Sequence, residues 1–181
     1  NTRQEIAMKV FLDLDDTLIF SEFGKYINNP SYVKFFDGSC KSVLRPTAFL
    51  LLNLVREIDD DPFLITTATN TWAKFWNDAF ELNFSKIYSH EDFTCCMQDG
   101  PYARSVVSWN QKSLNLSDAV IIDNYPASFP SPQHKMMFVF GNVDRQRWFQ
   151  INEFTGDTSK DFIKSDELHI RTLMDKVKLL T

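Results

Sequence analysis

The chain has 181 residues and a net charge of −5, and its composition is 44% apolar and 24% charged. These values predict a single domain with a full apolar core and exclude an intrinsically disordered chain. They also argue against a broad basic surface for nucleic acid, and no apolar run reaches the roughly 18 residues that cross a membrane.

Short apolar runs alternate with amphipathic stretches from Met8 onward, while residues 1–7 can be an N-terminal extension. We predict strands over 8–14, 63–67, 86–89, 119–123 and 136–140. We predict helices over 46–58, from 70 onward, over 105–116 and from about 165 onward. This alternation predicts an α/β fold, Rossmann-like and three-layered, with helices on both faces of a mainly parallel sheet in one domain, 1–181.

Local signals support some of these boundaries. Pro46 suits the first turn of a helix, where its missing N–H costs nothing, and Asn70 can cap the next helix. The aromatic face of that second helix, which includes Trp72 and Trp76, is more typical of a core than of a stacking platform. Trp148 and its neighbour in sequence either flank a substrate or pack in the core.

The densest group of acids follows the first predicted strand, where Asp13, Asp15 and Asp16 precede Thr17. At an effective dielectric constant of about 20, two such charges 4 Å apart cost about 4 kcal/mol. A cation must offset this repulsion, or one acid must stay protonated. Mg²⁺ held by carboxylates together with a substrate phosphate fits the pattern. An acidic loop exposed to water explains the same residues without a ligand.

Polar residues also end two other predicted strands. Thr66 and Thr67 offer hydroxyl donors for phosphate oxygens, although β-branched residues are common in buried strands. Asp123 and Asn124 offer oxygen ligands at the end of a third strand. Because ligands bind beyond the carboxyl ends of parallel strands, we expect these side chains to lie together there.

A basic residue precedes the strand that ends in Asp123. Lys112 lies 123 − 112 = 11 positions before that aspartate, which allows it to reach back over the edge of the sheet. A lysine there would stabilise an attacking carboxylate and the charge on a transferring phosphoryl group. A solvated lysine at a helix end explains the residue equally well.

With these residues the chain resembles the haloacid dehalogenase-like (HAD) superfamily, which is defined by four short motifs. The candidates are FLDLDDTL at 11–18, LITTAT at 64–69, Lys112, and IIDN at 121–124. Within the superfamily the chain most resembles the FCP/SCP-type phosphatases, which act on phosphoserine in proteins such as the RNA polymerase C-terminal domain. This similarity rests on five segments: DLDDTL, Arg45-Pro46, TTAT, DNYPASF at 123–129 and the tail SDELHIRTLMDKVKLL.

The resemblance implies a phosphoric monoester hydrolase that forms an aspartyl-phosphate. Asp13 would be the nucleophile and Asp15 the general acid and base. Four residues would contact the substrate: Thr17, Thr66, Thr67 and Lys112. Mg²⁺ would be the cofactor, with Asp13, Asp15, Asp123 and Asn124 as its ligands. Because the family lysine tends to follow a Gly-x-Tyr segment, Arg104 after Gly100-Pro101-Tyr102 is a rival to Lys112.

The resemblance also implies a minimal cap, because no large cap domain fits between the motifs. The segments 28–44 and 90–102 are each expected to form a small hairpin that leaves the site open to a bulky substrate. The phosphorylated substrate is then a phosphoprotein, or alternatively a nucleotide or nucleic-acid end. The alternative from another functional class is a HAD-like domain that binds a partner without hydrolysing a substrate.

The cysteines indicate the compartment. The chain has three cysteines, Cys40, Cys95 and Cys96, and an odd count does not indicate a disulfide framework. The adjacent pair also lacks zinc-ligand spacing. We therefore expect reduced thiols and a cytoplasmic protein, or a nuclear one if its host is a eukaryote.

Overall fold

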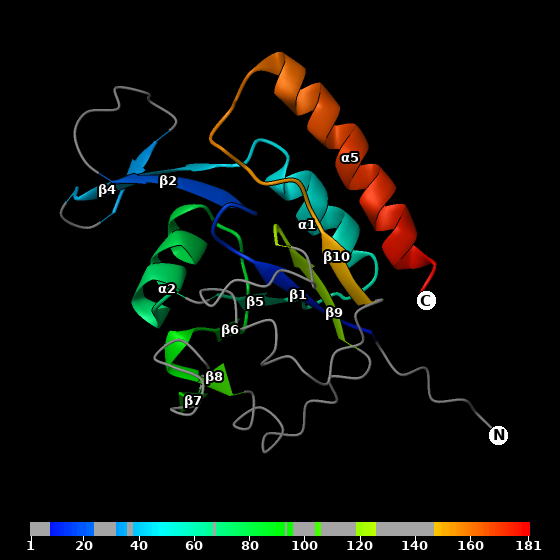
Figure 1. Ribbon diagram of the computed structural model, residues 1–181, viewed down its shortest axis with the longest axis horizontal. Helices are drawn as coiled ribbons and strands as arrows, with labels where there is room; N and C mark the ends of the chain where they lie inside the picture. Colours follow the sequence, from blue (N-terminus) through cyan, green and yellow to red (C-terminus); the bar gives the residue numbers. More distant parts are fainter. Residues whose placement is uncertain are drawn as a thin grey trace.

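The fold is seen in a computed structural model that describes residues 8–23, 32–35, 38–66, 68–92, 94–95, 104–105, 119–125 and 147–181. Its centre is a five-stranded sheet in the order β10-β9-β1-β5-β6, in which every neighbouring pair is parallel (Figure 1). The strands are β1 (Lys9–Asp13), β5 (Phe63–Ile65), β6 (Ile87–Tyr88), β9 (Ala119–Asp123) and β10 (Trp148–Gln150). The prediction of a parallel sheet is confirmed.

Four of these strands lie within predicted ranges, whereas β10 was not predicted. Trp148 and Phe149 form this edge strand beside β9, and Phe149 packs against the main core. The core reading therefore fits Phe149, while Trp148 is half-buried and donates its indole N–H to the Tyr125 carbonyl at 2.8 Å. A strand of three residues in a polar stretch is too short to show an apolar pattern. The predicted strand at 136–140 lies outside the described residues.

Three α-helices occur in the described part of the chain: α1 (Ala48–Arg56), α2 (Asn70–Ala79) and α5 (Lys160–Lys178). Thr47 is the N-cap of α1, so Pro46 lies in the turn before the helix and not in its first turn. Thr69, not Asn70, caps α2, because its hydroxyl accepts a hydrogen bond from the Trp72 N–H. Helix α5 begins at Lys160, well before the predicted start near 165.

The early start of α5 has a local cause. The Ser159 hydroxyl accepts a hydrogen bond from the Phe162 N–H, which satisfies one of the free donors of the first helical turn. The apolar stripe that marks this helix in the sequence begins later, because its first turns are mostly exposed. The predicted start was therefore wrong.

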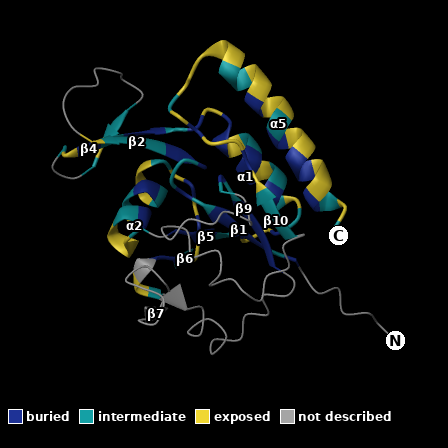
Figure 2. Ribbon diagram, viewed as in Figure 1, coloured by how far each residue is buried: buried dark blue, intermediate teal, exposed yellow. Residues whose placement is uncertain are grey.

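All three helices cover one face of the sheet (Figure 1). Val10 and Leu12 point to this face and form one core cluster with residues of α1, α2 and α5, such as Leu52, Trp76 and Ile170. The alternate residues of the strands point to the other face, where Phe11 packs against Phe63 and Tyr88. Figure 2 shows the buried strands beneath the exposed outer side of α5.

The second helical layer was predicted from residues 105–116. Only the first of these positions is described, and Ser105 lies in a strand, β8 (Arg104–Ser105), so the predicted start of this helix was wrong. Residues 106–116 lie outside the described part of the chain. Of the part that is described, no helix is long and apolar enough to cross a membrane.

Two small antiparallel sheets accompany the main one. Strands β2 (Ile19–Phe23), β3 (Val33–Lys34) and β4 (Cys40–Leu44) pair in the order β2-β4-β3, and β7 (Thr94–Cys95) pairs with β8. The first sheet contains the predicted hairpin within 28–44, but β2 adds a strand that was not predicted. The pair formed by β7 and β8 ends at Ser105, slightly beyond the predicted hairpin segment 90–102. The described parts agree with a minimal cap.

Candidate active site

The polar ends of three neighbouring strands meet at one edge of the main sheet. Asp13 is the last residue of β1, Asp123 is the last of β9, and Thr66 directly follows β5. The pairs Leu12↔Ile122 and Asp13↔Ile65 keep these strand ends level with one another. The structure therefore brings Asp13, Thr66 and Asp123 together at the carboxyl edge, whereas Thr67, which was expected there too, lies outside the described residues.

Asp13 is fixed by the loop that follows it. The Thr17 hydroxyl donates a hydrogen bond to Asp13 Oδ2 at 2.9 Å and accepts one from the Asn124 N–H at 3.2 Å. The Thr17 side chain is fully buried, so its bracing contacts are shielded from water. The loop is tight, because Leu18 N–H and Ile19 N–H both donate to the Leu14 carbonyl. One carboxylate oxygen of Asp13 is thereby held in place.

The electrostatic surroundings of Asp13 disfavour a bare carboxylate. Burial raises its pKa well above the usual value, and the charges of Asp123 and Asp15 raise it further, against the opposing hydrogen bonds from Thr17 and Leu14. Burial also raises the pKa of Asp123 to about 6. None of the ion pairs among the described residues involves these three acids. The site therefore favours a cation as a counter-charge.

The Asn124 amide shows how a cation fits. One end of the amide lies 3.1 Å from Asp13 Oδ2 and 3.0 Å from Asp123 Oδ1. With its nitrogen on this side, the amide donates to both carboxylates. With its oxygen on this side, the amide lies from one oxygen of each carboxylate at a separation close to the roughly 2.9–3.0 Å between adjacent ligands of octahedral Mg²⁺ with bonds of 2.0–2.1 Å. The residues present fit this ion.

The donors that converge are two carboxylates and one amide. Within the described residues, no group of three or more His, Cys, Asp or Glu side chains is arranged to hold a metal. This agrees with a Mg²⁺ site that relies on one or two carboxylates and leaves other positions to water and substrate oxygens. The predicted set of Asp13, Asp15, Asp123 and Asn124 stays a prediction.

Asp15 has different neighbours from Asp13, although it lies only two residues further on. The Trp72 indole N–H donates to Asp15 Oδ1 at 3.0 Å, and the Thr66 hydroxyl lies 3.5 Å from Oδ2. Burial raises the pKa of Asp15 to about 6, while the hydrogen bond from Trp72 lowers it. A carboxyl group with this pKa is partly protonated near neutral pH, as a general acid requires.

Trp72 is a site residue that sequence reasoning placed in the core. Its ring stacks on the Phe23 ring at 6.1 Å between centroids and 15° between planes, and its N–H reaches the carboxylate of Asp15. A tryptophan that is largely covered usually finds a partner for its N–H. That general rule was the only signal in the sequence, and it does not identify the partner.

The predicted phosphate-binding residues are only partly described. The Thr66 side chain is buried, and its hydroxyl accepts a hydrogen bond from the Ala68 N–H at 3.0 Å. Thr67 and Lys112 lie outside the described residues, and for Arg104 only a backbone position in β8 is described. The roles of these residues in binding phosphate stay predictions.

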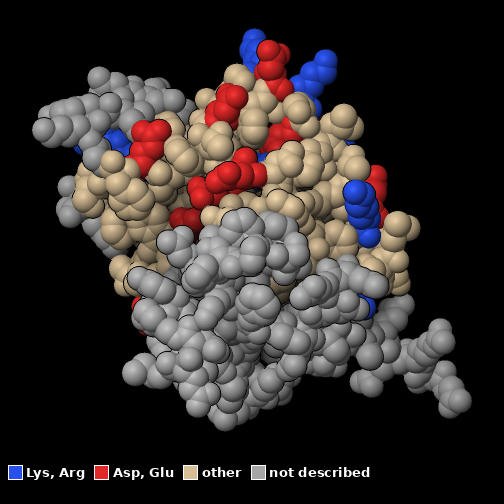
Figure 3. Space-filling model, in the orientation of Figure 1, with Lys and Arg blue, Asp and Glu red and all other residues tan. Residues whose placement is uncertain are grey.

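A pocket of about 600 Å³ opens beside Asp15 and Asp16. Its other lining residues are aromatic or small and come from β2, α2 and the turn before α2: Phe20, Ser21, Phe23, Ala68, Thr69 and Trp72. Figure 3 shows acidic side chains gathered near the middle of this face of the molecule. The pocket therefore combines aromatic and small side chains with the two acids Asp15 and Asp16.

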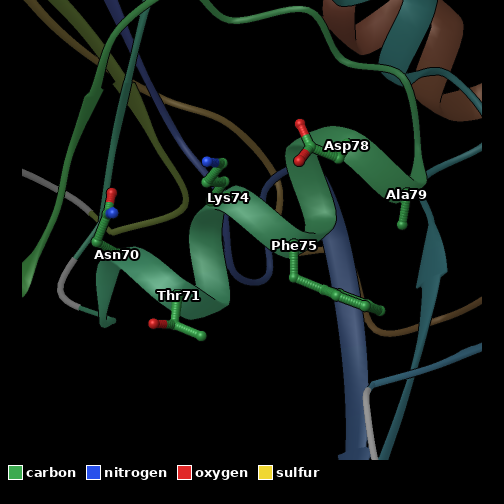
Figure 4. Close-up of a pocket in the computed structure, with 6 residues that line it drawn as sticks. All are labelled: Asn70, Thr71, Lys74, Phe75, Asp78 and Ala79. Atoms are coloured by element: carbon green, nitrogen blue, oxygen red, sulfur yellow. The ribbon is translucent and has the colours of Figure 1, made fainter.

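A second pocket of about 570 Å³ lies along α2 and is lined by Asn70, Thr71, Lys74, Phe75, Asp78 and Ala79 (Figure 4). All of these residues belong to one helix, and none of the strand-end acids is among them. The residues that line it are polar, apolar and of both charges, with no excess of acids. We therefore place the active site at the edge of the sheet and not here.

Comparison with known proteins identifies relatives of this chain among solved structures and protein families. A search of curated proteins finds no match. Among solved structures, the fold matches fission yeast RNA polymerase II CTD phosphatase Fcp1, in a variant bound to beryllium fluoride, with a TM-score of 0.50 and 14% identity. The match covers 98% of this chain and 54% of that one, so the chain spans about half the length of this relative. At this identity the likeness shows a shared HAD-like fold.

The sequence comparison is more specific. The family described as "NLI interacting factor-like phosphatase", which is of the FCP/SCP type, matches residues 8–164. The match begins with β1 and ends within α5, and it includes Asp13, Asp15 and Asp123. The chain therefore belongs to the NLI interacting factor-like phosphatase family.

Proposed function

We propose that this chain is a Mg²⁺-dependent phosphomonoester hydrolase in which Asp13 forms an aspartyl-phosphate. The observation that carries the proposal is the contrast between two acids of one loop. Thr17 holds Asp13 against Asp123 and Asn124, while Asp15 faces Trp72 with a pKa raised to about 6. This arrangement separates an attacking carboxylate from a proton donor, which a binding domain would not need.

In the first step, the free oxygen of Asp13 attacks phosphorus and forms a new P–O bond. The bond between phosphorus and the ester oxygen breaks, and the leaving oxygen takes the proton held by Asp15. In the second step, a water molecule attacks phosphorus and gives a proton to Asp15. The P–O bond to Asp13 then breaks and releases inorganic phosphate, so both residues return to their starting states.

The residues that would hold Mg²⁺ are Asp13 and Asn124 through side-chain oxygens and Asp15 through its backbone carbonyl, with Asp123 beside them or as a direct ligand. When bound, the ion offsets the negative charge of the carboxylates and of the phosphate. Thr17 fixes which oxygen of Asp13 is free to attack, because its hydroxyl occupies Oδ2. Thr67 and Lys112 are proposed to contact the phosphoryl oxygens.

The pocket next to Asp15 supports a phosphoprotein as the substrate class. Phe23 is 77% exposed on the rim of this pocket, where its ring stacks on Trp72 and can contact an apolar residue beside a phosphorylated one. Asp15 and Asp16 line the same pocket, and their charges would repel the several phosphates of a nucleoside polyphosphate or of a nucleic-acid strand. A phosphopeptide carries a single phosphate and meets less repulsion. A mononucleotide also carries a single phosphate, so against it the exposed apolar ring of Phe23 is the distinguishing feature.

The activity itself is tested with a generic aryl phosphate. We expect hydrolysis with Mg²⁺, none with EDTA, and none in Asp13→Asn, which keeps the shape of the side chain but removes the nucleophile. Asp78→Asn on the outer side of α2 is a matched control that should keep full turnover. Equal turnover in Asp13→Asn and the wild type would exclude Asp13 as the nucleophile.

The substrate class is tested by a panel of phosphopeptides and nucleotides at equal concentration. We expect the larger kcat/KM values for phosphopeptides with an apolar residue next to the phosphoserine. Phe23→Ala should lower kcat/KM for these peptides and leave the aryl phosphate unaffected. A strong preference for mononucleotides would move the assignment to the nucleotide phosphatases.

The basic residue of the third motif is tested by two substitutions. We expect Lys112→Ala to lower turnover of the aryl phosphate far more than Arg104→Ala, because Lys112 is the proposed contact of the phosphoryl group. The reverse order of these two effects would assign the role to Arg104.

A further inference from the structure

Arg45 joins three separate segments from a fully buried position between β4 and α1. Its Nε and Nη2 donate to the two carboxylate oxygens of Asp166 on α5, at 2.7 Å and 2.5 Å. The hydroxyl of Thr47 donates to the same carboxylate. The carboxylate of Asp166 is also buried, so this bidentate pair is shielded from water and holds the guanidinium plane in one orientation.

The remaining arm of the guanidinium reaches the loop that carries the nucleophile. Arg45 Nη1 donates to the Thr17 carbonyl at 3.0 Å and to the Asn152 carbonyl at 2.9 Å. Close by, the Phe154 N–H donates to the Asp16 carbonyl at 2.7 Å. Two consecutive carbonyls of the loop are thus held from outside it, one by Arg45 and one by the segment after β10.

The loop needs such support because its backbone is strained. Asp16 has a φ of 60°, which is in the left-handed region that residues other than glycine rarely adopt. Such conformations persist where surrounding contacts determine them, and they occur often at functional sites. The residue after Asp16 is Thr17, whose hydroxyl holds Asp13 Oδ2. A movement of the Thr17 backbone therefore moves the nucleophile.

Stability alone does not explain this arginine. A buried ion pair often contributes no more to stability than an apolar pair of the same volume. A lysine could also satisfy the charge of Asp166, but its ammonium cannot bind a carboxylate through two parallel donors and bridge two carbonyls at once. The geometry uses the one feature that distinguishes arginine, a planar fork with donors on several sides.

We propose that Arg45 is a positioning residue for the reaction, which fixes the Thr17 backbone from its anchor on Asp166 and so aligns Asp13 for attack. This inference rests on the proposed function of Asp13, and it makes α5 part of the support of the active site. Arg45 acts through Thr17, so it should influence the attack on phosphorus more than the binding of substrate.

The test compares Arg45→Lys with Arg56→Lys in the presence of Mg²⁺ and an aryl phosphate. Arg56 also donates to a backbone carbonyl, that of Leu82 at 2.8 Å, but this contact is remote from the strand-end acids. We expect Arg45→Lys to lower kcat by roughly 100-fold with KM within about twofold, since a small misplacement of a reacting group costs about this much. Arg56→Lys should keep kcat within about twofold.

A double variant separates positioning from stability. Arg45→Met with Asp166→Leu replaces the buried pair by apolar side chains, which is often neutral or stabilising. We expect this variant to melt near the wild-type temperature and still to lose kcat as strongly as Arg45→Lys. Wild-type kcat in the double variant would overturn the proposal, as would a loss of kcat that occurs only where the melting temperature falls.

A second readout does not depend on turnover. Amide hydrogen exchange of Leu18 and Ile19, whose N–H groups bond the Leu14 carbonyl, reports the order of the loop. We expect faster exchange at these amides in Arg45→Lys and no change in Arg56→Lys. Unchanged exchange in both variants would overturn the positioning role. An inactive wild type would instead overturn the proposed function, and the exchange rates would still decide the role of Arg45.

Discussion

Asp13 and Asp15 lie two residues apart, and their different contacts support the different roles that we propose for them. Asp13 is crowded by Asp123 and braced by Thr17, whereas Asp15 is bound by Trp72 and borders the apolar pocket. Crowding by acids calls for a cation next to Asp13. Burial raises the pKa of both acids, that of Asp15 to about 6, but Asp13 also lies beside Asn124 and the charge of Asp123, so we assign the proton to Asp15. The two needs correspond to a nucleophile and a general acid.

This division of roles predicts how Asp15→Asn depends on the substrate. A phenolate with electron-withdrawing groups leaves without a proton, whereas an alkoxide needs one. We therefore expect Asp15→Asn to slow the first chemical step only a little for p-nitrophenyl phosphate and by about 10²–10⁴-fold for an alkyl phosphate. Single-turnover rates measure this step directly. Equal losses for both substrates would contradict the role of Asp15 as the acid.

At the scale of single elements, helix α5 depends on its cap. The Ser159 hydroxyl accepts the Phe162 N–H at 3.2 Å, and Asp161 adds a negative charge to the first turn. We expect Ser159→Ala to lower the free energy of unfolding by about 1 kcal/mol, measured by denaturant titration. Ser165→Ala, at an exposed position inside the same helix, is the control and should change stability by less. Equal effects would show that the cap is not formed.

His169 connects the same helix to the segment after β10. The Asn152 N–H donates to His169 Nε2 at 3.0 Å, which is possible only while that nitrogen is unprotonated. Burial lowers the pKa of His169; Asp166 opposes this shift, while Arg45 and Lys176 add to it. Because the folded protein then binds fewer protons than the unfolded chain, this contribution to stability is complete above about pH 6.5 and is lost as the pH falls below it.

The variant His169→Gln tests this pH dependence, because glutamine accepts the same hydrogen bond and does not titrate. We expect the difference in unfolding free energy between wild type and variant to be constant above pH 7 and to move in favour of the variant below pH 6.5. Taking the difference removes the opposite effect of Asp13, Asp15 and Asp123, whose pKa values are raised by folding. Parallel profiles at all pH values would contradict the account.

The elements show how far the sequence predicts the fold. The β9 strand was predicted to the residue, because four apolar residues in a row, three of them β-branched, suit a strand buried on both faces. Short edge elements such as β10 and β2 carry no such pattern, so they were missed. Two helix starts were also misplaced. Helix α1 begins at Ala48, after Thr47, whose side chain makes no cap hydrogen bond, and α5 begins at Lys160, after the cap Ser159, which spacing does not reveal.

The residues of the candidate site that could be predicted from the sequence are those whose chemistry restricts the residue type. The residues that were missed are those that reach the site only through packing in the folded structure. The acids at the ends of β1 and β9 are recognisable because carboxylates at neighbouring strand ends are costly without a ligand. Trp72 and Arg45 reach the site through a ring N–H and a guanidinium arm. Their partners Asp15 and Thr17 lie 57 and 28 positions away in the chain, and only the folded structure brings them together. Their residue types alone fit an ordinary core equally well.

At the scale of the whole molecule, the proposed Mg²⁺ site at the strand-end acids predicts that stability depends on Mg²⁺. A ligand that binds only the folded state stabilises it by about 2.7 kcal/mol at a concentration of 100 Kd. We therefore expect Mg²⁺ to raise the melting temperature of the wild type. Asp123→Asn should raise the melting temperature in EDTA, because it removes a charge that repels Asp13, and should respond less to Mg²⁺. An identical response of both proteins would exclude Asp123 from the cation site.

The central claim is that phosphate passes through Asp13, and the most direct measurement is to trap it there. In Asp15→Asn, p-nitrophenyl phosphate can still phosphorylate Asp13, but the second step lacks its general base, so the phosphorylated form should accumulate. After rapid quenching in acid, peptide mass spectrometry should find one phosphoryl group on Asp13, and none when Asp13→Asn is added. A protein that turns over substrate while Asp13 stays unmodified, and that remains active as Asp13→Asn, would contradict the account.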